Sequence, residues 1–370
     1  MQYWLEPLFP LNFIYLLLNY LITISIISFF SIKYNIKKRY FIMLVATAVA
    51  PILLNGPLME WSALPDQSKY LSETMKIRNL DFYNLDGRLS IFLPSLIFAI
   101  SPFIFIESFN SIGFINRTFL SLFIIYLLKK KVNPLLIYYL TLSPTILLYT
   151  STALKDCIII ILSTFVFIGI TKNKFLVLLI PATILNFIKV QNAYIMFLMY
   201  VSHKYIFNIK FPYKKFFTAI IVLIIFMFIL VKEDLFIQTI NRYFYNFCFE
   251  DALCVTGEQY KNYLELLLSI PSRIFLFIIS PFPQVNSIIK ICIVIENVIV
   301  IYYLTSIFSN FFTNRKKEFY FWFTSIFVFI SMYAITITNH GTISRYKITF
   351  IIPFLIILEL IKKNKKNKNE

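Results

Sequence analysis

Apolar runs of about 15–22 residues recur along almost the whole of this 370-residue chain, separated by short polar or basic stretches. A helix needs about 20 residues to cross the hydrocarbon core of a bilayer. Hydrophobic residues make up 59% of the chain and charged residues 14%, whereas soluble domains are about 45–50% apolar and roughly a quarter charged. The sequence therefore predicts an all-α, polytopic integral membrane protein that forms a single membrane domain over residues 1–370.

Several function classes are disfavoured by what the sequence lacks. It has 6 glycines and neither of the glycine-rich patterns that cradle nucleotide phosphates. The net charge of +17 is explained by basic loops that orient the chain and by a short basic tail, KKNKKNKNE, so we expect no nucleic-acid partner. No cysteine and histidine spacing suggests a zinc site, and we expect no metal or other cofactor.

The basic loops predict the topology, because short loops rich in lysine and arginine face the cytoplasm. The clearest lie at 33–40, 129–131, 171–174, 203–215 and 313–317, followed by the tail. Placing them inside gives eleven spans, with the N-terminus outside and the C-terminus in the cytoplasm. The spans are 11–31, 40–58, 114–128, 134–150, 157–170, 175–188, 193–207, 216–231, 286–308, 319–337 and 346–361.

Residues 88–108 leave the span count open. The segment is apolar enough to cross the membrane, but it contains Pro94 and Pro102. We interpret it as a re-entrant or interfacial segment, which is tolerated where protein or a water-filled cavity covers the backbone. If it crosses instead, the chain has twelve spans and its N-terminus lies inside.

Polar residues gather on the predicted outer side. Of the 18 acidic residues only Glu318, Glu359 and Glu370 fall inside. The topology was predicted from the basic loops, because acidic residues contribute little to orientation, so the gathering of acidic residues on one side is an independent observation. Two outer loops, at about 55–88 and 232–284, carry acidic, amide and aromatic side chains. We therefore expect the protein to act at its outer face.

Two cysteines lie in the larger of these outer loops. Cys248 and Cys254 flank the short stretch FEDAL. An oxidising compartment would allow them to form a disulfide. The closed loop would be short, so the entropic gain would be modest.

The stretch SPTILLYTSTALKD, from Ser143 to Asp156, places a charged pair between two apolar runs. By the predicted topology, Lys155 and Asp156 lie at the outer ends of two spans, where charges must pair, reach water or serve a site. Pro144 can kink the first span, and the small hydroxyl residues after it would let a substrate approach closely. The pair is therefore either part of a site or a solvated turn.

Further polar side chains occupy predicted outer positions. They are Asp66 in PDQSKY, Lys189 and Gln191 in NFIKVQNAY, Arg273 in IPSRIFLFIISPFP, and His340, Arg345 and Tyr346 in NHGTISRYK. Arg345 lies on the face where cations are disfavoured, which favours a functional role over a topological one. Cations bind phosphate oxygens, and a carboxylate can deprotonate a sugar hydroxyl. The set matches glycosyl transfer from a lipid-linked pyrophosphate donor.

The order of four stretches resembles bacterial polysaccharide or O-antigen repeat-unit polymerases of the Wzy type, within the multi-span lipid-linked glycosyltransferases. The stretches are PDQSKY, SPTILLYTSTALKD, IPSRIFLFIISPFP and NHGTISRYKITFIIPF, and they cover residues from about 60 to 355. The chain departs from the commonest pattern at Gln284, where related proteins often carry an aromatic residue. Its number of spans, eleven or twelve, is also open.

The resemblance implies a helical enzyme of the bacterial inner membrane with one large periplasmic loop and no required metal. It would move a growing chain from undecaprenyl pyrophosphate to a new lipid-linked repeat unit, making O-antigen or capsular polysaccharide. Membrane lipid would surround it, and a chain-length regulator protein is a further candidate partner. We hypothesise that Arg345 and Lys155 hold the pyrophosphate and that Asp66 or Asp156 orients or deprotonates the acceptor hydroxyl.

The remaining candidates are assigned to substrate binding. Arg273 and Lys189 would make secondary phosphate contacts, and Gln191, His340 and Tyr346 complete the set. Three other functions stay open: a ligase that attaches finished glycan, in which His340 would be catalytic, a transferase that uses a polyprenyl-monophosphate donor, and a flippase for the lipid-linked unit. A flippase would favour internal repeats and short loops on both sides, and the outer loop of about 50 residues argues against it.

Overall fold

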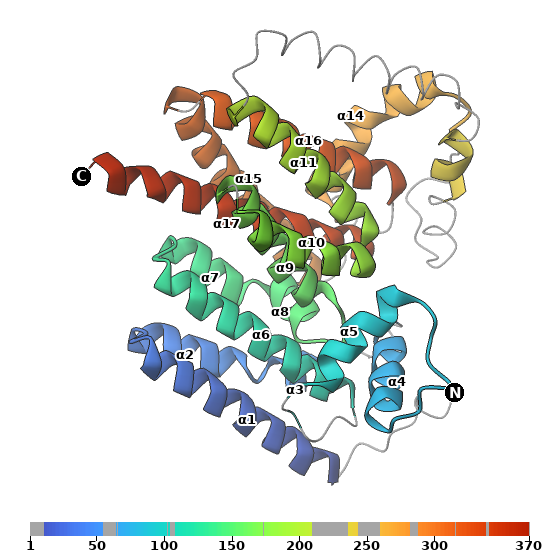
Figure 1. Ribbon diagram of the computed structural model, residues 1–370, viewed down its shortest axis with the longest axis vertical. Helices are drawn as coiled ribbons and strands as arrows, with labels where there is room; N and C mark the ends of the chain where they lie inside the picture. Colours follow the sequence, from blue (N-terminus) through green and yellow to red (C-terminus); the bar gives the residue numbers. More distant parts are fainter. Residues whose placement is uncertain are drawn as a thin grey trace. The chain divides into compact units, whose positions relative to one another are not determined.

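The computed structural model describes residues 11–54, 64, 66–101, 103, 108–172, 174–208, 236–242, 260–281, 288–314, 316–337 and 340–369. Every regular element in these residues is a helix, and none is a strand (Figure 1). Four helices are long and apolar enough to cross a membrane, over Ile14–Lys33, Phe109–Lys129, Lys290–Thr313 and Lys317–Thr336. The prediction of an all-α polytopic membrane protein is therefore confirmed for the described part of the chain.

The chain divides into two compact units, which we describe separately. The first unit contains Met1–Met196 and Ile352–Glu370, and the second contains Phe197–Ile351. The helices of the first unit are α1 (Leu11–Lys33), α2 (Lys38–Thr47), α3 (Ala50–Leu54), α4 (Asp66–Arg78), α5 (Leu89–Ala99), α6 (Phe109–Lys129), α7 (Pro134–Leu142), α8 (Pro144–Thr150), α9 (Asp156–Lys172) and α10 (Phe175–Ile188), with the start of α11 (Val190–Asn208) and the end of α17 (His340–Asn369).

Helix α6 forms the core of the first unit. It contacts α1, α3, α4, α7, α8 and α9, and Figure 1 shows it between α1 and α7. In its most apolar stretch 78% of the residues are buried, against 22% in α1. A long apolar helix can cover its surface with protein or with lipid. Helix α6 is covered mainly by protein, whereas α1 exposes an apolar surface that suits lipid. The end of α17 is also core: Phe354 is buried, and its ring centroid lies 4.7 Å from that of Phe167.

The span expected at 134–150 is broken into α7 and α8. Pro144 has no N–H with which to continue α7. The side chain of Ser143 accepts a hydrogen bond from the backbone N–H of Ile146 at 3.3 Å and so begins α8. The kink expected at Pro144 is therefore a break between two helices.

Two further segments depart from regular spans. The range expected to span at 40–58 contains α2 and α3, with Pro51 in the first turn of α3. Helix α5 has 11 residues and is about 16 Å long, which is too short for a hydrocarbon core of about 30 Å. That length agrees with a re-entrant segment at 88–108. The span expected at 216–231 lies outside the described residues.

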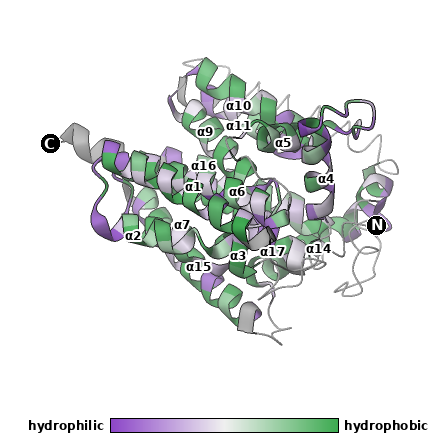
Figure 2. Ribbon diagram, turned by 90° about the horizontal axis from the view of Figure 1, so that it is seen from below, coloured by the Kyte–Doolittle hydropathy of each residue, from purple (hydrophilic) through white to green (hydrophobic). Residues whose placement is uncertain are grey.

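Basic residues meet at one end of the first unit. The ammonium of Lys129 lies 4.5 Å from the ring centroid of Tyr34, and Lys363 donates a hydrogen bond to the carbonyl of Lys130 at 2.7 Å. Figure 2 shows hydrophilic residues at helix ends and turns, such as the turn before α2, and hydrophobic residues along the helices. Three of the stretches that sequence analysis assigned to the cytoplasm, the 33–40 loop, the 129–131 loop and the basic tail, therefore share one end of this unit.

The second unit contains α14 (Tyr263–Ile279), α15 (Ile288–Asn314) and α16 (Lys316–Thr336), with the rest of α11 and the first part of α17. In the most apolar stretch of α15 only 17% of the residues are buried, as expected of a helix in lipid. Helix α14 falls in the expected outer loop at 232–284, yet it exposes large apolar side chains. These are Leu264, Leu267, Leu268 and Phe275. Tyr263–Ile279 of the expected outer loop are thus an apolar helix.

Lys347 joins three helices of the second unit. Its ammonium donates to the carbonyls of Ile278 and Ser280 at 3.1 and 2.9 Å, and to Oδ1 of Asn297 at 2.9 Å. The two carbonyls belong to the C-terminal end of α14, where a cation interacts favourably with the helix dipole. Glu296, which is also buried, interacts electrostatically with the same ammonium. Lys347 therefore fixes where α14 ends.

Lys347→Met should lower the stability of the second unit by about 2–3 kcal/mol, because the Ile278 carbonyl and the Asn297 side chain lose a buried donor. Thermal unfolding of the purified protein in detergent measures the loss. Lys317→Met is the matched control, since Lys317 is an exposed residue of α16. Equal melting temperatures for the two variants would contradict the structural role.

Candidate functional site

Residues 151–155, between α8 and α9, form a short non-helical segment inside the first unit. Ser151 and Thr152 are fully buried, so the backbone of this segment needs partners within the protein. The side chain of Asn116, on α6, donates to the carbonyls of Thr152 and Leu154 at 2.8 and 2.7 Å. Two carbonyls of the segment are thus held by one side chain of the central helix.

Helix α4 supplies a further partner for this segment. Oε1 of Gln67 accepts a hydrogen bond from the backbone N–H of Ala153 at 2.9 Å. Gln67 is 1% exposed, and it belongs to the stretch PDQSKY. The contact therefore joins two of the motifs that sequence analysis singled out, although 86 residues separate them along the chain.

Helix α6 approaches this segment closely at Gly113. A Cβ added to Gly113 would overlap the carbonyl oxygen of Ser151 and lie 3.1 Å from Cβ of Pro51. The backbone of α6 therefore approaches the segment more closely than any side chain on α6 would allow. The sequence suggested close approach of a substrate here, and the close approach at Ser151 in the structure is that of α6.

Lys155 lies where four elements meet. Its ammonium donates to the carbonyl of Ser90 in α5 and to that of Ile188, the last residue of α10, both at 3.1 Å. It also lies 5.8 Å from the ring centroid of Tyr70 on α4, within the range of a cation–π contact. The side chain is partly exposed. Lys155 thus contacts two of the other stretches named in sequence analysis, PDQSKY through Tyr70 and NFIKVQNAY through Ile188.

The two carboxylates proposed as bases differ in exposure. Asp156 begins α9 and is 1% exposed, in the first turn, where the helix dipole favours a negative charge. Asp66 begins α4, pairs with Lys69 at 3.0 Å, and has a side chain that is 37% exposed. A bulky sugar can therefore reach Asp66 more readily than Asp156.

Lys189 and Gln191 lie at the junction of α10 and α11. Lys189 is buried and Gln191 is half-buried. The contact from Lys155 to the Ile188 carbonyl brings this junction to the same place as α4 and the 151–155 segment. Three stretches of the predicted site, PDQSKY, STALKD and IKVQN, thus lie together at one end of the first unit.

Hydrogen bonds hold α4, α5 and the connection between them together. The buried carboxylate of Glu73, on α4, accepts a hydrogen bond from the backbone N–H of Asp86 at 2.7 Å. Arg78, the last residue of α4, donates to the carbonyls of Ala99 and Ser101 at the C-terminal end of α5, at 3.0 and 3.1 Å. These bonds fix α4 against α5 and so help to position Gln67 and Tyr70.

An ion pair precedes the Ser90 carbonyl that Lys155 uses. The guanidinium of Arg88 donates to both carboxylate oxygens of Asp86, at 2.9 and 2.6 Å. These hydrogen bonds lower the pKa of Asp86 to about 2. The Asp86 carboxylate is therefore ionised throughout the physiological pH range, so the charge next to the start of α5 is constant over that range.

The remaining predicted residues belong to the second unit. Arg273 on α14 and Arg345 on α17 are half-buried. Tyr346 is also half-buried, and its ring stacks on that of Tyr333 with centroids 5.1 Å apart. His340 is the first residue of α17, and its side chain lies outside the described part of the structure, as do Gln284, Cys248 and Cys254.

Sequence analysis missed Asn116 and Arg117, two adjacent polar residues on α6. Arg117 is fully buried, and its Nη2 donates to the carbonyl of Thr141 at 3.3 Å, in the last turn of α7. Because Pro144 provides no N–H, carbonyls in that turn need other donors. The stretch INRT inside an apolar run was the available signal, since ionisable residues within a span are rare and functional by default.

Among the described residues, no group of three or more histidine, cysteine or acidic side chains lies close enough to hold a metal ion. Cys157 is a buried free thiol, and its Sγ donates to the carbonyl of Asn116 at 3.2 Å. The groups gathered at this end of the first unit include the ammoniums of Lys69, Lys155 and Lys189, the carboxylates of Asp66 and Asp156, and the ring of Tyr70. Comparisons with protein families, with curated proteins and with solved structures find no match for the chain.

Proposed function

We propose that this protein is a polysaccharide polymerase of the Wzy type, which joins lipid-linked oligosaccharide repeat units at the outer face of a bacterial inner membrane. The observation that carries the proposal is the position of Lys155, which contacts α4, α5 and the end of α10 at one end of the first unit. A cation with an aromatic ring and carboxylates beside it suits a sugar attached to a phosphate. The basic residues at the other end of the unit support a cytoplasmic side there.

The reaction we propose needs no cofactor. A hydroxyl oxygen of the acceptor unit attacks the anomeric carbon of the donor sugar, and a new C–O bond forms. The bond from that carbon to the pyrophosphate oxygen breaks, and its electron pair leaves with undecaprenyl pyrophosphate. The proton of the acceptor hydroxyl passes to a carboxylate, for which Asp66 is the better candidate because it is the more exposed.

The cations act on the leaving group. Negative charge increases on the pyrophosphate as the bond breaks, and a fixed cation stabilises that charge more than it stabilises the ground state. Lys155 and Arg345 are assigned this role, with Lys189 and Arg273 as further phosphate contacts. Gln191, Tyr346 and His340 remain candidates for sugar contacts. A chain-length regulator is a candidate partner at the periplasmic side.

Deleting the gene should reduce the surface polysaccharide from a ladder on a gel to core carrying a single repeat unit. Wild-type protein should restore the ladder and Arg345→Ala should not, because the variant loses a cation that stabilises the leaving group. Arg39→Ala, at an exposed arginine of α2, is the control and should restore the ladder at equal protein level.

Other outcomes of the deletion distinguish the alternatives. Loss of every repeat, including the single unit, would indicate a flippase, a ligase or an assembly transferase. An unchanged ladder would contradict the polymerase proposal.

A further inference from the structure

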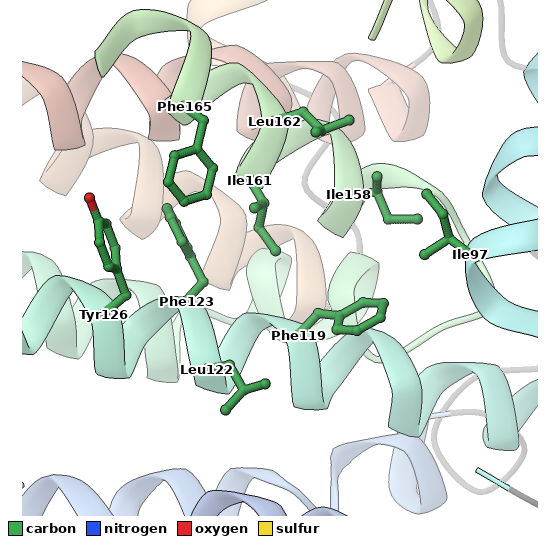
Figure 3. Close-up of a pocket in the computed structure, with 9 residues that line it drawn as sticks. All are labelled: Ile97, Phe119, Leu122, Phe123, Tyr126, Ile158, Ile161, Leu162 and Phe165. Carbon is green, nitrogen blue, oxygen red and sulfur yellow. The ribbon is translucent and has the colours of Figure 1, made fainter. Parts of the chain in front are cut away.

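An apolar groove runs along the outside of the first unit, between α6 and α9 (Figure 3). Its volume is about 350 Å³, and every residue that lines it is aliphatic or aromatic. It is lined by Ile97 of α5, by Phe119, Leu122, Phe123 and Tyr126 of α6, and by Ile158, Ile161, Leu162 and Phe165 of α9. In Figure 3, Ile97 and Ile158 lie at one end and Tyr126 at the other.

The groove is elongated along the helices. The lining residues of each helix are spaced by three, one and three positions, which places them on one face of the helix. Seven residues separate the first from the last on α6 and on α9, a distance of about 10 Å along the axis. A groove of this form, between two helices, has room for a single hydrocarbon chain that lies parallel to them.

One end of the groove adjoins the polar site. Ile158 follows Asp156 by two residues in the first turn of α9, and Ile97 belongs to α5, the helix whose Ser90 carbonyl binds Lys155. At the opposite end the rings of Phe123, Tyr126 and Phe165 form a cluster, with centroids 5.6–6.3 Å apart. The groove therefore begins at Ile158, three residues after Lys155 along the chain, and leads away from that end along apolar side chains.

We propose that this groove holds the first part of the isoprenoid chain of a polyprenyl-phosphate lipid, with its phosphate beside Lys155. The proposal rests on the proposed function and identifies where the lipid of that substrate lies. Charge favours this occupant, because the phosphate is anionic and Lys155 precedes Ile158, at one end of the groove, by three residues. Shape favours it as well, because a polyprenyl phosphate carries one chain on its head group, whereas a membrane phospholipid carries two.

The test is binding of undecaprenyl phosphate to the full-length protein in nanodiscs of phosphatidylcholine. Ile161→Trp places an indole in the middle of the groove and should weaken binding at least tenfold. Ile14→Trp makes the same change on α1, at a residue that is 53% exposed, and should leave binding unchanged. Ile161→Phe fills less of the groove and should cause a smaller loss of binding than Ile161→Trp. It replaces Ile161→Trp in the test if thermal unfolding shows that Ile161→Trp is unstable.

Two results would overturn the proposal. One is equal binding by Ile161→Trp and Ile14→Trp, both folded. The other is displacement of undecaprenyl phosphate by an equal concentration of phosphatidylglycerol, which would mean that the groove takes any anionic lipid. The probe carries no sugar, so binding does not depend on polymerisation. If binding depends on the groove but deleting the gene leaves the polysaccharide ladder unchanged, the polymerase proposal is rejected and the groove proposal stands. If deletion collapses the ladder but binding does not depend on the groove, only the groove proposal is rejected.

Discussion

Lys155→Met should reduce the rate of polysaccharide formation by about 100-fold or more, the usual effect of losing one preorganised group that stabilises transition-state charge. The ammonium contacts α4, α5 and α10 at once, so methionine removes the charge from the point where the motifs meet. Membranes supplied with lipid-linked repeat units provide the assay, with polymer measured over time. Lys155→Arg keeps the charge and should retain part of the rate.

Lys38→Met is the matched control for this prediction, because Lys38 is an exposed residue at the start of α2. Its rate should equal that of the wild type. Lys155 also binds two carbonyls, so a purely structural role must be distinguished. If Lys155→Met lowers the rate only in proportion to the amount of folded protein in the membrane, the catalytic assignment is wrong.

Gly113→Ala should destabilise the first unit by about 3 kcal/mol, at the upper end of what overpacking a core costs. The added Cβ would overlap the Ser151 carbonyl, and that oxygen belongs to a segment fixed by Asn116 and Gln67. Neither the backbone of α6 nor that of the segment can move without breaking these bonds. Thermal unfolding in detergent measures the effect, and the polysaccharide ladder should shorten with it.

Gly87→Ala is the control for Gly113→Ala. An added Cβ at Gly87 meets no atom within 4 Å, so the free energy of unfolding should change by no more than about 0.5 kcal/mol. Equal melting temperatures for the two variants would mean that α6 and the 151–155 segment are not in close contact.

The fold class could be predicted from sequence because it depends on run length and composition, which are local properties. Continuity of the spans could not be predicted as well. Pro144 signals a kink, but only the side-chain cap from Ser143 shows that a second helix begins there. Helix α14 was missed for another reason: LLLSIPSRIFLFII contains an arginine and a proline, and the topology needed an outer loop in that range.

The site was predictable only in part. Successive loops alternate between the two sides of the membrane, and this alternation placed Asp66, Lys155 and Lys189 on the same side; the structure brings their stretches together. The alternation cannot tell which side chains meet, since contacts such as that from Gln67 to Ala153 depend on how the helices pack. Asn116 fixes the 151–155 segment from the middle of an apolar run, where a hydrophobicity scan registers only a brief fall.

The first unit is built from two segments that lie far apart in the chain, and this has a consequence for its synthesis. Its buried core includes the 352–358 stretch of α17, with Phe354 against Phe167, yet residues 197–351 belong to the other unit. At about 5–20 residues per second, the ribosome takes roughly 8–30 s to make that intervening segment. During this interval the membrane holds an incomplete bundle around α9 whose last helix does not yet exist. Assembly of this unit is therefore finished after translation of the rest, and a truncation that removes only the C-terminal end should damage the half of the protein made first.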